Sequence, residues 1–172
     1  MGVIMEFDEV IQNRETVRKF SSKKVTKKQL EKILEAGRIA PTAMNRQPQR
    51  VFVLSSDDAL AKMDKVHRCR YGAKTVLLVC VDTSLVVELN GETHPEVDGT
   101  IAATHMLLEA YNVGVDSVWL GIFNAKDVRK EFNLDKKLLP ICFIDLGFRA
   151  KDYAGNPMHT QKNPLETMVT RL

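Results

Sequence analysis

The segment Thr75–Val81, with the sequence TVLLVCV, is the feature that most limits the folds open to this chain. Every residue after Thr75 is apolar, so a strand here would bury side chains on both of its faces. We therefore interpret it as a central strand of a sheet. No longer apolar run occurs in the 172 residues, and none approaches the length of about 20 residues that a membrane-spanning helix needs.

Two helices are predicted with particular clarity. Thr26-Lys27-Lys28-Gln29 has the pattern of a capping box, and apolar residues at helical spacing continue from it to about Arg38. The segment Asp98–Asn112 is apolar nearly all round, which is typical of a helix buried in a core or in a subunit interface. Gly114 suits the position that ends this second helix.

Shorter elements alternate along the rest of the chain. We expect a first helix over 7–13 with Val10 and Ile11 facing inward, and further helices over 57–65 and 125–132. Strands are expected over 51–54, 117–120 and 141–146, and the segment between Tyr71 and Asp98 holds little beyond a strand and a polar loop. Such alternation favours an α/β or α+β class.

Composition and length predict one globular domain over residues 1–172, because 44% of the residues are hydrophobic and 27% are charged. The tail from about Lys151 contains Gly155, Pro157 and Pro164 and is expected to be extended. The first eight residues lack the basic and apolar regions of a secretory signal. Three cysteines without CxxC spacing are typical of buried thiols in a reducing compartment, so we predict a cytoplasmic location.

Positive charge is concentrated near the N-terminus. The segment from Arg14 to Arg38 has nine Lys and Arg and three Glu, a net charge of +6, so the remainder of this +3 chain carries −3. The asymmetry indicates an anionic partner, or else a solvated lysine-rich face. A nucleic-acid-binding module built on this segment is one alternative, although Phe20 is its only aromatic residue for base stacking.

The motifs of most catalytic machineries are missing. The chain has no GxGxxG, GxxxxGK[ST], HExxH or GxSxG, and its four histidines have no metal-ligand spacing. We therefore predict no metal and no catalytic side chain. An enzyme built from these residues would take its chemistry from a cofactor.

The segment Asn13–Phe20, with the sequence NRETVRKF, is the candidate for binding that cofactor. Arg14, Thr16 and Arg18 alternate, so in an extended chain all three side chains project from one face. Two guanidinium groups beside a hydroxyl would bind a dianionic phosphate. The alternative is a pair of surface arginines in a connection.

The same segment opens a series of motifs. Its sequence is close to the consensus of a known family, approximately N-R-R-S-x-R-x-F. The segment ILEAGRIAPTAMNRQPQRVFVL, which follows it, is close to a second consensus of the same family, approximately A-x-x-A-P-S-A-x-N-x-Q-P-W. EVDGTIAATHMLLEAYNVGVDSVWLGIF, LPICFIDLGF and HTQKNPLETMV follow in order. With these motifs the chain resembles the nitroreductase-like FMN-dependent oxidoreductase family, of which it would be a short member.

The resemblance implies an α+β fold, an α/β/α sandwich around a mixed, mainly antiparallel sheet, in a homodimer with FMN in two clefts at the interface. It assigns Arg14, Glu15, Thr16 and Arg18 to the FMN phosphate and ribityl chain, with Glu15 replacing a residue that is usually basic. It assigns three further groups of residues to FMN: a loop from the partner subunit (Pro41, Thr42, Ala43 and Asn45), a strand and turn at the flavin ring (Val118, Trp119, Leu120 and Gly121), and a basic residue at the phosphate (Lys162).

The activity implied by the resemblance is that of an FMN-dependent NAD(P)H oxidoreductase. NADH or NADPH would deliver a hydride to flavin N5 and leave, and an electron-poor small molecule such as a nitroaromatic or a quinone would then be reduced in the same cleft, a ping-pong sequence. The partners expected are a second copy of the chain and the small-molecule acceptor, with no nucleic acid and no membrane. A protein that stores or senses FMN with little turnover is the second alternative.

Overall fold

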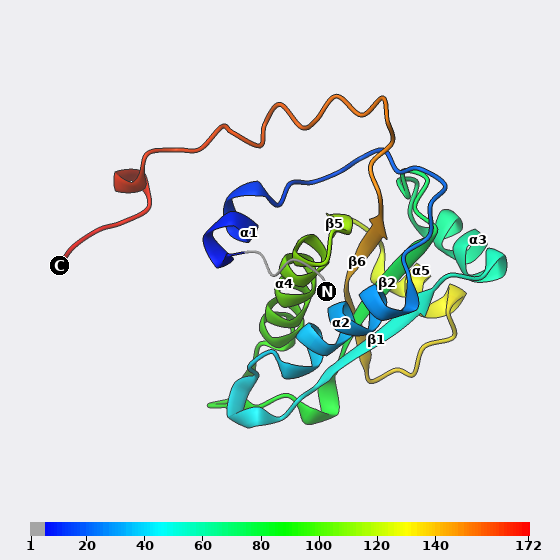
Figure 1. The fold of residues 1–172 in the computed structure, drawn as a ribbon. Coiled ribbons are helices and arrows are strands. Elements are labelled where there is room, and N and C mark those ends of the chain that lie inside the picture. The colour runs from blue at the N-terminus through cyan, green and yellow to red at the C-terminus, as the bar shows by residue number, and fades with distance from the viewer. Residues whose placement is uncertain (1–5) are drawn as a thin grey trace.

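A computed structural model describes residues 6–172; residues 1–5, which belong to the segment considered above as a secretory signal, lie outside it. Its centre is a four-stranded sheet in the order β1 (Gln49–Leu54), β2 (Thr75–Asp82), β6 (Leu138–Gly147) and β5 (Asp116–Leu120) (Figure 1). All neighbouring pairs are antiparallel. Every residue of β2 is buried, which confirms the predicted central strand.

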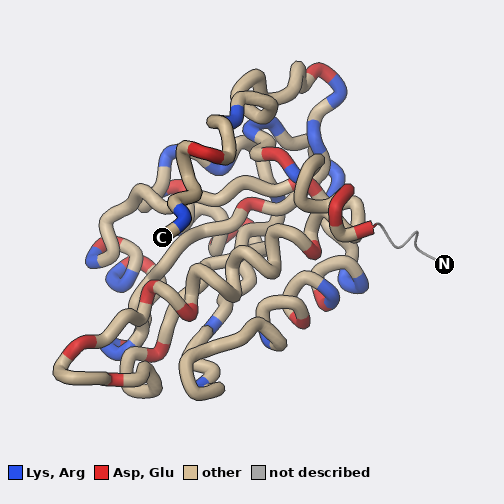
Figure 2. The backbone as a smooth tube through the Cα atoms, turned by 90° about the vertical axis from the view of Figure 1, so that its left-hand side faces the viewer, with Lys and Arg blue, Asp and Glu red and all other residues tan. Residues whose placement is uncertain are grey.

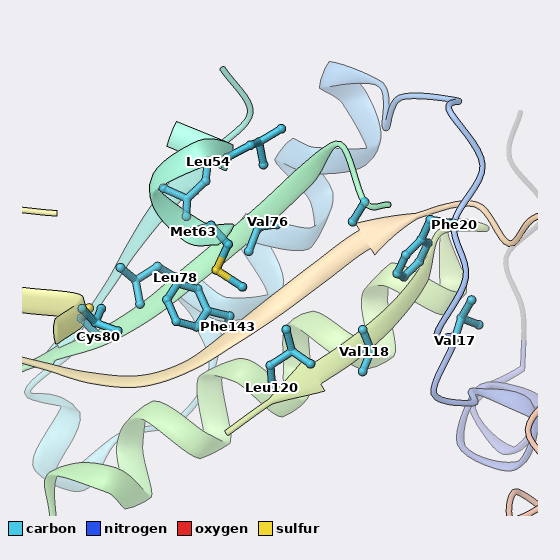
Figure 3. Packing of buried hydrophobic residues seen from close by; sticks show 13 residues of the cluster. Val17, Phe20, Leu54, Met63, Val76, Leu78, Cys80, Val118, Leu120 and Phe143 are labelled. Atoms are coloured by element: carbon cyan, nitrogen blue, oxygen red, sulfur yellow. The ribbon is translucent and has the colours of Figure 1, made fainter. Parts of the chain in front are cut away.

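Helices cover both faces of this sheet. Leu77 and Val79 of β2 pack with residues of α2 (Lys27–Ile39) and α4 (Pro95–Asn112) on one face. Val76, Leu78 and Cys80 alternate with them and face α3 (Asp57–Val66) and α5 (Ala125–Glu131) on the other (Figure 3). The period of two in an apolar strand thus produces two hydrophobic cores and confirms the predicted α/β/α sandwich.

Local signals in the sequence determine where the helices begin. The Thr26 hydroxyl accepts a hydrogen bond from Gln29 N, and Gln29 Oε1 accepts one from Thr26 N, so the predicted capping box is formed. The side chains of Ser56 and Asn124 accept hydrogen bonds from backbone N–H groups in the first turns of α3 and α5. The first helix, α1 (Phe7–Asn13), buries Val10, but Ile11 is 47% exposed, so the prediction that both face inward is wrong for Ile11. Neighbouring helical residues lie about 100° apart, and only one of them meets α4.

After α1 the chain becomes extended and runs along the outer edge of β5. Val17 N donates to Ser117 O at 3.0 Å, in a parallel bridge between Thr16 and Ser117. Phe20 N donates to Tyr71 O, and the Val17 and Phe20 side chains are buried in the core on the α3 side (Figure 3). This short parallel contact joins the N-terminal segment to an otherwise antiparallel sheet.

Two regions differ in detail from the sequence prediction. The predicted polar loop before α4 contains a short 3₁₀ helix and a hairpin formed by β3 (Glu88–Leu89) and β4 (Glu92–Thr93). The tail extends away from the sheet and contains a 3₁₀ turn at Leu165–Thr167 (Figure 1). Leu165 and Met168 of the tail are exposed. Within residues 6–172, no helix is both long and apolar enough to cross a membrane.

The helix α4 lies directly on the sheet at Gly99. A Cβ atom built on Gly99 would lie 2.7 Å from Ile141 Cγ1 and 2.8 Å from Val81 Cγ2. Both neighbours are β-branched side chains with little rotamer freedom. Glycine at this position therefore determines how closely the helix approaches β2 and β6.

We predict that Gly99→Ala lowers the free energy of unfolding by about 1–3 kcal/mol, because the new methyl group overpacks the core. The clash outweighs the helix preference of alanine, which favours it by about 0.5–1 kcal/mol. Urea denaturation at one protein concentration would measure the change. Thr100→Ala, at the exposed neighbouring position, is the control and should change the free energy by less than about 0.5 kcal/mol. A Gly99→Ala protein as stable as the wild type would contradict the argument.

Candidate functional site

A pocket of about 460 Å³ lies at the free edge of β5, and it brings together two of the groups of residues that the sequence singled out. Arg18 contributes from the extended segment, and Val118, Trp119, Leu120 and Gly121 contribute from β5 and the turn after it. Its opposite wall is the connection between α3 and β2, from Val66 to Tyr71. Concave pockets with a few polar groups are the usual sites for small ligands.

The two arginines of the extended segment are available to a ligand. Among the residues that the structure describes, neither Arg14 nor Arg18 forms an ion pair with a carboxylate. Arg18 is exposed at the pocket, whereas Arg14 and Thr16 are half-buried and lie outside its lining. The predicted alternation is formed, because Val17 between them is fully buried. An unpaired guanidinium at a pocket is suited to an anionic group.

The backbone of β5 adds hydrogen-bond donors to the same edge. Ser117 O accepts from Val17 N, so the backbone groups of Ser117 point outward, and those of Trp119, two residues later, point the same way. Val118 and Leu120 bury their side chains in the core instead. A Cβ atom on Gly121 would lie 2.9 Å from Trp119 Nε1, so glycine lets the half-buried indole lie against the turn.

The wall from Val66 to Tyr71 is a part of the pocket that the sequence did not indicate. Tyr71 has a φ of 49°, which is rare for an aromatic residue, and Gly72 follows at 86°. Burial raises the pKa of the Tyr71 hydroxyl, which lies beside the Cys69 thiol and the Arg18 guanidinium. The sequence of this turn has no periodicity from which its position could be predicted. The turn also brings His67, Arg68 and Cys69 to the pocket.

Glu15 takes a different part from Arg14 and Arg18. Its carboxylate accepts a hydrogen bond from Arg149 Nη1 at 2.5 Å and another from Asn156 N at 3.1 Å. The acidic residue at this usually basic position is therefore neutralised within the chain by an arginine that follows β6. Glu15 does not line the pocket.

The predicted loop Pro41–Asn45 lies at the other end of the sheet from Arg18. It leads into β1 at Gln49, which pairs with Val81, whereas Thr75 pairs with Leu146 at the end where the extended segment docks (Figure 1). Pro41, Ala43 and Asn45 are exposed and Thr42 is half-buried. Ala43 N donates to the buried Asp98 carboxylate at 3.0 Å, and Asn45 has a φ of 56°. One chain therefore does not bring this loop to the pocket.

Lys162 is also absent from the pocket lining. It is exposed on the tail, where its Nζ atom donates to His159 O at 2.6 Å. The tail extends away from the sheet beyond this point (Figure 1). The predicted residues therefore lie in three places. One group lies at the edge of the pocket, and within a single chain the Pro41–Asn45 loop and Lys162 both lie away from the pocket.

Comparison with known proteins agrees with this architecture. The family model of the Nitroreductase family matches residues 11–71 and 69–148, which include the extended segment, the sheet and the pocket. The chain belongs to the nitroreductase family. A relative from Methanothermobacter thermautotrophicus, with the provisional name NADH dehydrogenase/NAD(P)H nitroreductase, is 29% identical over 160 residues, which cover 86% of this chain and 80% of the relative.

Solved structures of the family have the same fold. A nitroreductase family protein from Clostridium difficile 630 has a TM-score of 0.90 and 35% sequence identity, with 96% of this chain and 98% of that chain covered. A protein from Exiguobacterium sibiricum 255-15 with the provisional name nitroreductase, solved in complex with FMN, has a TM-score of 0.85 at 17% identity, and the match covers 98% of both chains. At that identity the second likeness demonstrates the shared fold alone.

A buried carboxyl group lies across the sheet from Val118, which lines the pocket of this nitroreductase-family protein. Asp145 of β6 pairs with Val118 across the sheet, is fully buried, and has no hydrogen-bond partner for either oxygen among the described residues. Burial raises its pKa to about 8, which the nearby Arg70 guanidinium only partly opposes. Arg70 itself forms two hydrogen bonds with Asp64, at 2.8 and 2.7 Å. Burial therefore favours the protonated form of Asp145.

We predict that stability falls as the pH rises between the ordinary pKa of 3.8 and about 8, because the folded state keeps a proton on Asp145 that the unfolded chain releases. The contribution of this group changes by roughly 1.4 kcal/mol per pH unit. Asp145→Asn removes it. Urea denaturation at pH 5 and pH 8 should therefore show the variant gaining on the wild type at the higher pH. Parallel pH profiles for the two proteins would mean that Asp145 is ionised in the fold.

Proposed function

We propose that this chain is an FMN-dependent NAD(P)H oxidoreductase that reduces electron-poor small molecules such as nitroaromatics or quinones. The observation that carries the proposal is the pocket in which unpaired Arg18 meets the free backbone edge of β5 at Trp119 and Gly121. The protein from Exiguobacterium sibiricum, which shares the fold, is described in complex with FMN. The relative from Methanothermobacter thermautotrophicus carries an NAD(P)H nitroreductase name.

The residues present fit a phosphorylated ligand with a planar ring. Arg14, Thr16 and Arg18 supply positive charge and a hydroxyl for the phosphate and ribityl chain. Outward N–H groups of β5 donate to polar atoms at the ring edge, and glycine at position 121 lets the Trp119 indole lie against the turn that lines the pocket. When bound, FMN supplies the group that accepts a hydride from NAD(P)H and passes it to the acceptor.

The protein residues in this scheme bind, orient and shield. The hydride donor and the electron acceptor occupy the same pocket in turn, which gives ping-pong kinetics. The scheme requires no side-chain acid or base. The outward N–H groups of the β5 backbone stabilise negative charge at the ring edge. The exposed pocket mouth at Ile122 and Arg68 leaves room for acceptors of several shapes.

We further propose a homodimer in which each site uses both chains. Within one chain the loop at Pro41–Asn45 leads into β1 at one edge of the sheet, whereas the pocket lies at β5, the other edge, so a second copy is needed to bring a loop to the pocket. The protruding tail supports the same arrangement. Its exposed side chains Leu165 and Met168 would lose solvent contact against a partner.

The charge pattern of the basic segment gives no support to the nucleic-acid-binding alternative. Within the basic segment, Arg38 pairs with Glu35 at 2.6 Å and Lys27 with Glu31 at 3.8 Å, and Lys19 pairs with Asp152. Along α2 the two signs of charge are interspersed (Figure 2), which is unlike the continuous basic surface that binds nucleic acid. A storage or sensor protein would bind FMN in the same pocket and differ in turnover.

We predict that the purified protein has the visible spectrum of oxidised flavin and loses it on anaerobic addition of NAD(P)H. Arg18→Ala should weaken FMN binding at least tenfold, because a charged hydrogen bond contributes about 1.5–3 kcal/mol. Equilibrium dialysis of FMN would measure the affinity, and denaturation would measure the stability of the same protein.

Lys28→Gln is the matched control, since it removes one positive charge of the basic segment from the exposed face of α2. A colourless protein that takes up no added FMN would refute the proposal. A protein that binds FMN but gives no turnover with NAD(P)H and a quinone would be the storage or sensor protein.

Complementation tests the shared site. Arg18→Ala and Asn45→Gly each alter one half of both sites in a homodimer; glycine at 45 also adopts the observed positive φ. A mixed dimer holds one site with both changes and one unaltered site. Refolding the two variants together in equal amounts should therefore restore tight FMN binding at about a quarter of all sites.

Arg18→Ala mixed with Thr16→Ala is the control for this complementation. Both changes lie in the same half of the site, so no mixed dimer contains an unaltered site and no tight binding should return. Restoration in this control, or none in the test mixture, would contradict the shared arrangement. Unchanged binding by Asn45→Gly alone would remove Asn45 from the site.

A further inference from the structure

A network of charged groups joins the extended segment to the tail. Arg149 forms hydrogen bonds with both oxygens of Asp116 at the start of β5, at 2.6 to 3.2 Å, and with Glu15 at 2.5 Å. The second oxygen of Glu15 accepts from Asn156 N in the tail. The carboxylate side chains are largely buried, with 11% of Glu15 and 14% of Asp116 exposed. The hydrogen bond to Asp116 raises the pKa of Arg149 above its ordinary value, so the group stays charged.

The network fixes one end of the segment that carries Arg14, Thr16 and Arg18. Val17 and Phe20 anchor the segment through burial and backbone hydrogen bonds at its middle and far end. Glu15 is the polar anchor at the near end, and it alternates with the ligand-facing side chains. The Tyr153 hydroxyl adds a hydrogen bond from the tail to Thr16 O at 3.0 Å.

The network also fixes where the tail leaves the body of the protein. Tyr153 lies against the Arg149 guanidinium, which is 5.8 Å from the centre of the ring. Asn156 is held by Glu15, and Lys162 follows six residues later on a segment that extends away (Figure 1). The direction in which Lys162 is presented therefore depends on the same carboxylate that anchors the phosphate-binding arginines.

We propose that Glu15 and Arg149 are positioning residues, through which the C-terminal tail holds the Arg14–Arg18 segment in the geometry that binds the FMN phosphate. The inference rests on the proposed function, because it concerns the same site. Neither side chain lines the pocket, so both act through the residues they hold. Small displacements of binding groups are costly, as misplacement by about 1 Å can reduce activity about a hundredfold.

Thermodynamic linkage makes this coupling reciprocal. If a fixed tail tightens FMN binding by some factor, then bound FMN must favour the fixed tail by the same factor. FMN should therefore slow tryptic cleavage after Lys162 in the wild-type protein. A network with a purely structural role would change the stability of the fold but would not couple the tail to the cofactor.

The test compares Glu15→Gln with Asp152→Asn. Both substitutions remove a carboxylate that pairs with a cation between the extended segment and the region after β6, but the Lys19–Asp152 pair is exposed, with 55% and 70% of the two side chains accessible. Exposed pairs contribute little. Glu15→Gln should raise the Kd of FMN at least tenfold, and at saturating FMN the cofactor should no longer slow cleavage of the tail. Asp152→Asn should change the Kd less than twofold and keep the protection.

Arg149→Lys provides the rescue series, because lysine keeps the charge but cannot bridge two carboxylates as a planar fork. Its Kd should fall between those of the wild type and Arg149→Met. Tight binding and intact protection in Glu15→Gln would overturn the positioning role while the proposed function stands. A wild-type protein that binds no FMN would instead overturn the proposed function. An equal loss of FMN affinity in Glu15→Gln and Asp152→Asn would also overturn the inference, since the loss of any ion pair between these segments would then be enough to weaken FMN binding.

Discussion

The docking of the extended segment on the edge of β5 is the contact on which the candidate site depends. One backbone hydrogen bond from Val17 N to Ser117 O sets the register, and burial of Val17 and Phe20 holds it. With Val17 turned into the core, Arg14, Thr16 and Arg18 must face outward. The same contact leaves the outer edge of β5 unpaired beyond Ser117 within the described residues. A pocket with arginine on one side and free backbone donors on the other follows from this register.

The fold was predictable where one local pattern determines the structure. The apolar alternation in Thr75–Val81 forms two cores, and the Thr26–Gln29 pattern begins α2 as predicted. The alternation of Arg14, Thr16 and Arg18 did not by itself decide between an extended segment and a helix, and in the structure the segment is extended. Their assignment to FMN came from the resemblance to a family and stays a prediction. Strand order could not be derived from the sequence, because β2 pairs with β6, which lies more than fifty residues later, and periodicity contains no information on such pairs.

The parts that could not be predicted depend on long-range pairing or on unusual backbone. Glu15 and Arg149 are 134 residues apart in the chain, so no sequence window could pair them, and Glu15 was assigned to FMN as a replacement for a basic residue, with no partner of its own. The wall of the pocket turns at Tyr71 with a positive φ that an aromatic residue rarely adopts. The environment of Asp145 was equally unpredictable, because the sequence does not show whether an aspartate in an apolar strand has a hydrogen-bond partner in the fold.

The buried, unpaired carboxyl group of Asp145 indicates that the residue at this position does not serve stability alone. A well-packed apolar residue would avoid the desolvation penalty of an unpaired carboxyl group. The group lies across the sheet from Val118, whose chain continues into the edge that lines the pocket. Unsatisfied buried polar groups in native proteins concentrate where function requires them. In its protonated form Asp145 adds no negative charge to β6 beside Val118, which lines the pocket.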